Sequence, residues 1–338
     1  MRIPWRGALG AVLSVGLLVW VLRDVDLAEV WLILRESNVW LFLLSSVVAT
    51  AIFPLRAIRW QVILSPVAGK LPFGPPWRAV AIGMMINNVV PARVGEIARA
   101  YALSREVPAV RFPAALASLA VDRVFDAIIV GILLVASTMV PGFPAGAEIA
   151  GQPVTRFALV FGLLMLGLVA ALIAIAAVPA RIVRLYELAV GRVAPGLVEP
   201  GERLITSFAS GLTVLHSPSR FLLVFWWTLV HWLANALAFY IAFFAVGVDA
   251  PFSAALFAQG IIVIGVALPS TPGFFGVFEA AATVALGLFG IGAAQAVSWA
   301  IGFHLVSFIP ITVIGAIYFA RLGLRLQDVR RTPAAGAA

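Results

Sequence analysis

Six apolar runs dominate the chain, and each has close to the roughly 20 residues that a helix needs to cross a hydrocarbon core. The runs lie at 7–22, 38–58, 112–140, 156–178, 220–247 and 295–320. Two shorter apolar stretches, 79–90 and 253–268, end in proline-containing turns, and such short runs are typical of re-entrant or interfacial segments. The pattern predicts an all-α integral membrane protein with six spanning helices and two re-entrant hairpins.

The segments outside these runs are short, with one exception. Mixed charge and spaced apolar residues in 179–219 predict one or two amphipathic helices on the cytoplasmic surface. The run 7–22 follows basic residues, but no small-residue cleavage site comes after it, so we expect a retained signal anchor. The end of the chain, 331–338, is predicted to be a disordered tail. Residues 1–330 are therefore predicted to form one polytopic membrane domain.

One order of segments occurs twice: a span, a short apolar stretch, a Pro-Gly loop, a short helix and a second span. The two copies cover about 38–140 and 220–320. In each copy a proline precedes a glycine by the same spacing at the tip of the short stretch, Pro91 with Gly95 and Pro272 with Gly276. In the predicted topology, the short hairpin of the first copy enters the membrane from the cytoplasm and that of the second copy enters from outside. The sequence thus predicts an inverted repeat, which is typical of secondary transporters.

Composition agrees with the membrane pattern and excludes several classes of protein. Apolar residues make up 63% of the 338 residues, charged residues make up 11%, and the mean hydropathy is +1.08. A soluble domain carries about 25% charged residues. The net charge of +8 comes from short segments that flank apolar runs, without the clustered basic face of a nucleic-acid binder. The absence of cysteine excludes disulfides and thiolate chemistry.

The basic residues also predict the orientation. With a cytoplasmic N-terminus, most Lys and Arg residues fall on the cytoplasmic side, and only Arg23, Arg35 and Arg156 fall outside. The positive-inside rule then predicts that both termini lie in the cytoplasm. The predicted location is the inner (plasma) membrane.

Charged residues at membrane depth are the first candidates for a ligand site, because such groups are costly there. The first loop carries Asn88, Arg93, Glu96 and Arg99, and the spacing allows Glu96 to pair with Arg99 on one helical face. The alternative is a shallow hairpin with an interfacial ion pair.

The span 112–140 carries Asp122, Arg123 and Asp126 in its first half. The two aspartates share a helical face, so we expect a cation between them, supplied by an arginine of the first loop or by Arg123. The alternative is a salt bridge that only ties the span to the hairpin. Paired carboxylates also serve as acid and base in enzymes, but no partner for such chemistry is evident.

The second loop carries Ser270, Thr271 and Gly273 before a helix whose first turn holds Glu279. The amide groups at the start of that helix are a natural anion site. For Glu279 the alternative is ordinary electrostatics at a helix start. At the end of the second span, Arg56, Arg59 and Trp60 are interpreted as an interface anchor or as a contact to a phospholipid headgroup.

Other chemistry finds little support in the sequence. His231 and His304 are each alone in apolar spans and are interpreted as packing residues, and the three histidines have no metal-ligand spacing. No phosphate-binding loop, dinucleotide fingerprint or nucleophile elbow occurs, so no cofactor, no metal and no catalytic residue is predicted.

At these motifs the chain resembles the lysylphosphatidylglycerol synthetase transmembrane region, also called the flippase-like domain family. The resemblance rests on Arg56-x-x-Arg59-Trp60, on the stretch from Asn88 to Glu96, on Asp122-Arg123 with Asp126, and on the Pro-Gly motif from Pro269 to Glu279. It implies translocation of an aminoacylated phospholipid or a lipid-linked precursor between leaflets. Phe274 stands where the family usually has a third loop glycine, and Asp122 where glutamate is usual.

The leading hypothesis is therefore flipping of an anionic or aminoacylated lipid without ATP, with membrane lipids as partners and no nucleic acid. A second hypothesis is a structural or regulatory partner of an envelope lipid or glycan enzyme. A third is an intramembrane enzyme acting on a lipid phosphate, with Asp122 or Glu96 as acid or base. The oligomeric state is not predicted.

Overall fold

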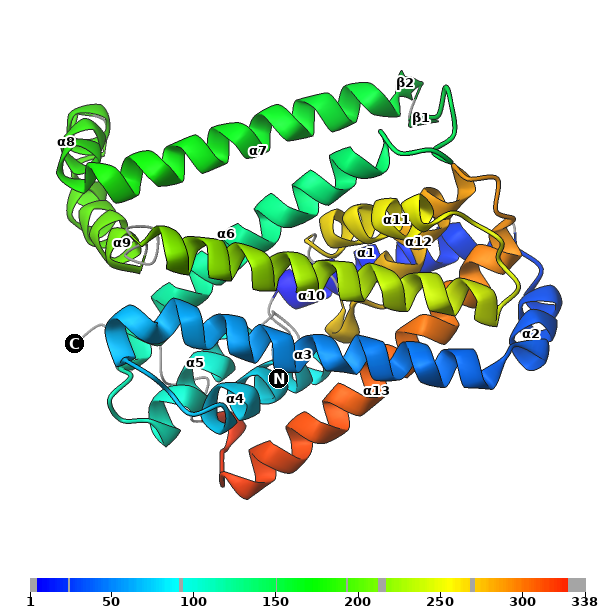
Figure 1. Cartoon of the computed structure of the whole chain (residues 1–338), viewed down its shortest axis with the longest axis horizontal. Coiled ribbons are helices and arrows are strands. Elements are labelled where there is room, and N and C mark those ends of the chain that lie inside the picture. Colours follow the sequence, from blue (N-terminus) through cyan, green and yellow to red (C-terminus); the bar gives the residue numbers. More distant parts are fainter. Residues whose placement is uncertain are drawn as a thin grey trace.

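Two long helices run side by side through the middle of the molecule, α3 (Val39–Ala68) and α10 (Pro218–Ala245) (Figure 1). The structure is a computed structural model. It describes residues 5–23, 25–90, 94–149, 151–192, 194–211, 217–267 and 271–327. The predicted tail, 331–338, lies outside the described residues.

Around the two central helices the chain is almost entirely helical, apart from a short hairpin of two strands. The other elements are α1 (Trp5–Leu22), α2 (Leu27–Glu36), α4 (Gly74–Val89), α5 (Gly95–Glu106), α6 (Phe112–Ser137), β1 (Glu148–Ile149), β2 (Gln152–Pro153), α7 (Val154–Ala177), α8 (Pro179–Val190), η1 (Pro195–Leu197), α9 (Val198–Gly211), α11 (Phe252–Val266), η3 (Pro272–Phe274), α12 (Val277–Gly287) and α13 (Ala293–Arg321).

Four described helices are long and apolar enough to cross a membrane: α3, α10, α13 and the part of α7 from Val154 to Ala171. They coincide with four of the six predicted spans, and the protein is a multi-pass, all-α membrane protein. The predicted span 112–140 falls on α6, which has 26 residues but carries three charged residues near its middle. The run 7–22 falls on α1, an 18-residue helix, of which the apolar part with described side chains is Val12–Leu22. These two spans and the re-entrant hairpins stay predictions.

The boundaries of two predicted segments differ from the structure in an informative way. α3 continues about ten residues beyond the predicted end of its span, through Arg59 and Trp60, to Ala68. Charged residues end an apolar run in the sequence, but they do not end a helix when their partners lie inside the protein. The linker 179–219 holds two helices, α8 and α9, which pack against each other.

The order long helix, short helix, short helix, long helix occurs twice, as α3 to α6 and as α10 to α13. The packing follows the same scheme in both copies. α4 packs against α5 and α13, and α11 packs correspondingly against α12 and α6. Figure 1 places α4 and α5 near one end of the central helices and α11 and α12 toward the other. The two largest buried cores lie around Trp60 and around Trp299, and both copies contribute residues to each of them.

Glycines allow the helices of the first copy to approach closely. A Cβ atom at Gly83 of α4 would lie 2.8 Å from the carbonyl oxygen of Gly95 at the start of α5. A Cβ atom at Gly315 of α13 would meet the carbonyl oxygen of Ala81 on α4. Small residues at helix crossings are the usual way to pack helices in a membrane, where burial of apolar surface adds little. The α4–α5 hairpin is therefore held against α13 by close backbone contact.

Asn38 joins the start of α3 to the end of α10. Its side-chain oxygen accepts hydrogen bonds from the amides of Trp40 and Leu41 at 3.0 and 3.2 Å, and its own amide donates to the carbonyl of Ala245 at 2.8 Å. We expect Asn38→Ala to lower the free energy of unfolding by about 1 kcal/mol, because the helix loses its cap. Thermal unfolding in detergent measures this as a modest fall of the midpoint. Asn38→Asp, which keeps the acceptor, should stay near the wild type, and equal losses in both variants would contradict the capping role.

Candidate functional site

Three residues on one face of α3 begin the candidate site: Arg56, Arg59 and Trp60. Their spacing of three and four residues places them on the same side of the helix. Arg59 and Trp60 have no exposed surface, and Arg56 is 8% exposed. A fully buried guanidinium requires anionic partners, since an unpaired charge is costly in a medium of low dielectric constant.

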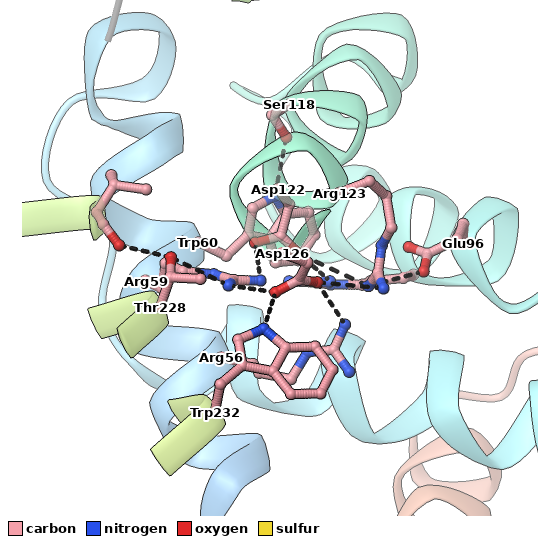
Figure 2. A network of polar contacts seen from close by, with 12 residues as sticks. Arg56, Arg59, Trp60, Glu96, Ser118, Asp122, Arg123, Asp126, Thr228 and Trp232 are labelled. Atoms are coloured by element: carbon pink, nitrogen blue, oxygen red, sulfur yellow. Dashed lines mark hydrogen bonds and ion pairs between the residues drawn. The ribbon is translucent and has the colours of Figure 1, made fainter. Parts of the chain in front are cut away.

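Arg59 finds these partners on α6, where it bridges two aspartates (Figure 2). Its Nη2 atom lies 2.6 Å from Oδ1 of Asp122, and its Nη1 atom lies 2.6 Å from Oδ1 of Asp126. Asp122 and Asp126 are four residues apart, so both carboxylates face α3. A planar guanidinium suits this double contact, because its donors point in two fixed directions.

α10 closes the same cluster from the third side. Thr228 accepts a hydrogen bond from Nη1 of Arg59 at 3.2 Å, and the indole of Trp232 donates to Asp126 at 3.0 Å. Figure 2 shows Asp126 with Arg59 and Trp232 on either side of its carboxylate. Asp126 therefore receives donors from α3 and α10 at once, which fixes how these helices sit against α6.

α5 contributes Arg99, which lies across the ring of Trp60. The guanidinium carbon is 4.1 Å from the ring centroid, and Nη1 is 3.1 Å from Oδ2 of Asp122. The indole of Trp60 donates in turn to the hydroxyl of Ser118 at 2.8 Å. A cation over an aromatic face is stabilised electrostatically, more strongly when it is desolvated. Arg99 is 3% exposed, so this contact and Asp122 hold it in place.

Arg123 and Glu96 form the outer edge of the cluster. Arg123 lies 3.0 Å from Glu96 and 3.3 Å from Asp126. Their side chains are 45% and 32% exposed, whereas that of Asp122 is fully buried. The cluster thus reaches from a partly open edge into the interior of the protein.

The cluster carries one net positive charge among the described residues. Its four guanidinium groups, those of Arg56, Arg59, Arg99 and Arg123, face three carboxylates, those of Glu96, Asp122 and Asp126. Three of the arginines have carboxylate contacts between 2.6 and 3.3 Å.

Arg56 is the least tightly held of the four. It lies 3.8 Å from Asp126 and 3.8 Å from the sulfur of Met84, and its Nε atom is buried without a hydrogen-bond partner. The excess positive charge therefore belongs mainly to Arg56.

Arg56 also lines a cavity of about 230 Å³ between the two copies of the repeat. Both central helices, α4, α11, α12, α13 and the loop around Gly273 contribute to its wall. The wall is mostly apolar, with polar groups from Asn88, His231, Gln259 and His304. A larger hollow of about 300 Å³ lies between α6, α7 and α11, but its lining is apolar apart from Thr138. The cavity beside Arg56 is therefore the candidate site.

Glu279 on α12 and His304 on α13 form a second buried pair, and His304 lines the cavity. Oε1 of Glu279 lies 2.7 Å from Nδ1 of His304, and Nε2 of His304 lies 2.7 Å from the carbonyl oxygen of Gly273. The other carboxylate oxygen of Glu279 accepts the amide of Gly276 at 2.6 Å, as in a capping box. Glu279 and His304 are 3% and 6% exposed.

The two copies of the repeat carry related pairs with reversed charges. In the first copy, the basic Arg99 on α5 faces the acidic Asp122 on α6. In the second copy, the acidic Glu279 on α12 faces the basic His304 on α13.

The loop before α12 has an unusual backbone, held by neighbouring groups. Gly273, Phe274 and Gly276 have φ angles of 71°, 64° and 84°, in the region that favours glycine. The amide of Thr271 donates to the hydroxyl of Ser14 on α1 at 2.9 Å. The position of Phe274 thus has the backbone conformation of a glycine, which agrees with the expectation of a third loop glycine there.

The structure places the predicted site residues in two groups. Arg59, Glu96, Arg99, Asp122, Arg123 and Asp126 meet in the charged cluster, and Asn88, Thr271, Gly273 and Glu279 lie on or near the cavity wall. Asn88 donates to Thr312 at 2.7 Å. Arg93 and Ser270 lie outside the described residues.

Some partners differ from those that spacing suggested. Glu96 pairs with Arg123 rather than with Arg99, and the cation between the two aspartates is Arg59. The burial of Arg59 rules out the interpretation as an interface anchor. His304 follows Gly276 at almost the same spacing as Asp122 follows Gly95. The repeat therefore aligns His304 with Asp122, and this was the signal that could have identified His304 as a member of a buried pair.

Thr228, Trp232 and the cavity residues His231 and Gln259 are also absent from the predicted site. Only their contacts across helices distinguish Thr228 and Trp232 from ordinary membrane residues. Within the described residues, no group of three or more His, Asp or Glu side chains is arranged to hold a metal ion.

Comparison with known proteins gives a family and three relatives. The model of the family described as lysylphosphatidylglycerol synthase TM region matches residues 7–315. The chain is 28% identical over 336 residues to a protein named glycosyltransferase AglD from Haloferax volcanii, covering 91% of this chain and 53% of that protein. It therefore spans about half the length of this relative.

Two further relatives are UPF0104 membrane proteins of Methanothermobacter thermautotrophicus. One is 26% identical over 335 residues, which cover 92% of this chain and 91% of the relative. The other is 27% identical over 305 residues, which cover 85% and 86%.

Proposed function

Because the chain belongs to the lysylphosphatidylglycerol synthase transmembrane family, we propose that it flips an anionic or aminoacylated phospholipid, or a lipid-linked precursor, between membrane leaflets. The observation that carries the proposal is a cavity with an incompletely paired arginine on one wall and an apolar lining around it. The sequence contains no phosphate-binding loop for ATP, so the movement is driven without ATP hydrolysis. The chain itself catalyses no covalent step in this proposal.

Arg56 is the group that recognises the phosphate. A phosphate diester carries one negative charge and accepts hydrogen bonds, and a guanidinium offers several donors in a planar array. Arg59, Arg99 and Arg123 are already held by carboxylates, so Arg56 is the arginine of the cluster left to bind an anion. An anion at Arg56 neutralises the excess charge of the cluster.

The lining of the cavity suits the remainder of such a ligand. Phe53, Phe239, Phe278 and Phe303 form much of the wall near the polar groups. A cavity of about 230 Å³ accommodates a headgroup but not the hydrocarbon chains, which stay in the bilayer. Asn88 and Gln259 provide amide groups for a polar headgroup.

The repeated order of helices supplies a route for movement. In this proposal the α4–α5 and α11–α12 hairpins are re-entrant and enter the membrane from opposite sides. Halves related in this way commonly expose a central site to each side in turn. Both termini lie in the cytoplasm and the protein resides in the plasma membrane, as the distribution of Lys and Arg indicates.

Arg56→Gln tests the proposed recognition in proteoliposomes that contain fluorescently labelled phosphatidylglycerol. We expect transfer between leaflets to slow by at least about tenfold, because a charged hydrogen bond to the ligand is lost. Arg105→Gln is the matched control, since Arg105 is exposed and its side chain donates to the hydroxyl of Tyr101. Transfer by Arg56→Gln at the wild-type rate would overturn the assignment of Arg56. Transfer by the wild type no faster than in protein-free vesicles would overturn the proposed function.

The relative named glycosyltransferase AglD favours one second candidate, a membrane partner of a glycan or lipid enzyme. Under this function the protein moves no lipid, and Arg56→Gln leaves partner binding intact. Co-purification of the enzyme with both wild type and Arg56→Gln, together with absent lipid transfer, distinguishes it from the first. Headgroup turnover by the purified protein would instead indicate an intramembrane lipid enzyme.

A further inference from the structure

His304 lies between two hydrogen-bond acceptors. Its Nδ1 atom is 2.7 Å from a carboxylate oxygen of Glu279, and its Nε2 atom is 2.7 Å from the carbonyl oxygen of Gly273. A carbonyl oxygen cannot donate, so Nε2 must carry a hydrogen. The contact with Glu279 also needs a hydrogen, which sits on Nδ1 or on the carboxyl group. The pair therefore holds two protons and is neutral as a whole, either as imidazolium with carboxylate or as imidazole with carboxylic acid.

Removing one proton breaks this arrangement. A neutral imidazole has a single N–H group, so it can donate to Glu279 or to Gly273 but not to both. Donation to the charged carboxylate is the stronger bond. The lone pair of Nε2 then faces the carbonyl oxygen of Gly273, and the two repel. Loss of the proton thus releases the loop around Gly273 from α13.

The surroundings of the pair contain few other charges. Among the described residues that line the same cavity, the other ionisable side chains are Arg56 on α3 and His231 on α10. The neighbouring helices α4 and α11 contribute the neutral amides of Asn88 and Gln259. The charged residues of α2, which also packs against α13, are exposed. Aromatic rings cover His304, with Phe275 stacked at 4.4 Å and Phe278 at 4.7 Å between ring centroids.

The loop that the pair controls is part of the cavity wall. Gly273, Phe274 and His304 all line the cavity that Arg56 also lines. Movement of the loop away from α13 therefore changes the access to this cavity. Gain or loss of a proton by the Glu279–His304 pair therefore changes how easily a ligand enters the cavity.

We propose that Glu279 and His304 form the binding site of a transported proton, and that one proton moves together with each lipid. One proton enters the pair from one aqueous side, which neutralises it and bonds the loop to α13. The same proton leaves toward the other side, which leaves one negative charge and frees the loop. No electron is transferred and no covalent bond other than that of the proton changes. The inference rests on the proposed lipid transfer for its coupling, and on the geometry alone for the site.

The proton site can be tested without any lipid substrate. The chain has three histidines, so nitrogen NMR of histidine-labelled protein in vesicles resolves few signals. The signals of His304 are identified by their absence in His304→Gln. We expect the hydrogen shared by Nδ1 and Glu279 to be present in acidic samples and lost in alkaline samples. In Glu279→Gln this change should be altered, and ring nitrogens of His304 that stay constant over the whole range would overturn the site.

The coupling is tested in proteoliposomes with labelled phosphatidylglycerol, a pH gradient and the membrane potential clamped at zero. With one proton per lipid, a gradient of one pH unit should shift the steady-state ratio of probe between leaflets by about tenfold. Glu279→Gln and His304→Gln should lose this shift, while Arg105→Gln keeps it. Fast transfer that ignores the gradient overturns the coupling but leaves the proposed function standing. A titrating pair without any lipid transfer overturns the proposed function and the coupling, but supports the proton site.

Discussion

Arg59→Gln is expected to leave little folded protein in the membrane. The guanidinium contacts Asp122 and Asp126 at 2.6 Å each, and neither it nor Asp122 has exposed surface. Removing the guanidinium leaves the two buried carboxylates with one fewer cation. Loss of one partner of a buried ion pair lowers the free energy of unfolding by about 3–5 kcal/mol. The measurements are the yield of monodisperse protein after extraction and the midpoint of thermal unfolding in detergent.

A second variant separates the loss of charge from the loss of packing. In Arg59→Gln combined with Asp122→Asn, fewer charges stay uncompensated, so the double variant should lose less stability than the two single losses added together. Arg156→Gln is the control, because Arg156 is exposed and contacts Gln152. A wild-type unfolding midpoint for Arg59→Gln would show that the cluster does not hold α3, α6 and α10 together.

Gly276→Ala should destabilise the protein by at least about 2 kcal/mol, since a residue other than glycine is strained at its φ angle of 84°. An added Cβ atom would also meet the carbonyl oxygen of Ser14 on α1. This contact is with backbone, which cannot turn aside as a flexible side chain does. We expect a clear fall of the thermal unfolding midpoint, and slower lipid transfer because the bonds from Gly276 to Glu279 and from Glu279 to His304 are disturbed.

Gly287→Ala is a matched control at the other end of α12. A Cβ atom there has open space around it, and the residue lies within the helix. Alanine favours helix over glycine by up to about 1 kcal/mol, so this variant should be neutral or slightly stabilising. Equal unfolding midpoints for Gly276→Ala and Gly287→Ala would contradict the close contact between the loop and α1.

Much of the fold follows from the apolar pattern, because helix length and hydropathy are properties of one segment at a time. The central helices α3 and α10, together with α7 and α13, are of this kind. The family also follows from the sequence, and its match to residues 7–315 confirms the resemblance. The far end of α3 does not follow, because Arg56 and Arg59 interrupt the apolar run while their partners lie on another helix.

The candidate site was predictable as a set of residues but not as a set of contacts. Spacing correctly places Asp122 and Asp126 on one face, yet it cannot supply Arg59, which is 67 residues from Asp126 along the chain. Local spacing also favours an ion pair between Glu96 and Arg99, whereas the packing of α5 against α6 pairs Glu96 with Arg123. A lone histidine in an apolar span shows nothing of its partner, so the contact of His304 with Glu279 needed the packing of α12 on α13.

The reversed charges of the two related pairs have a consequence for the symmetry of the molecule. The basic member of the first pair, Arg99, is a guanidinium, a group that is not deprotonated in proteins, whereas that of the second pair, His304, is an imidazole, which exists in a charged and a neutral form. With the proton site proposed above, acidification on one side of the membrane would act on the second copy of the repeat and leave the first unchanged. Two similar halves alone would not favour transport in either direction across the membrane. In the proposed mechanism, the difference between the basic residues of the two halves, arginine in one and histidine in the other, provides the preferred direction.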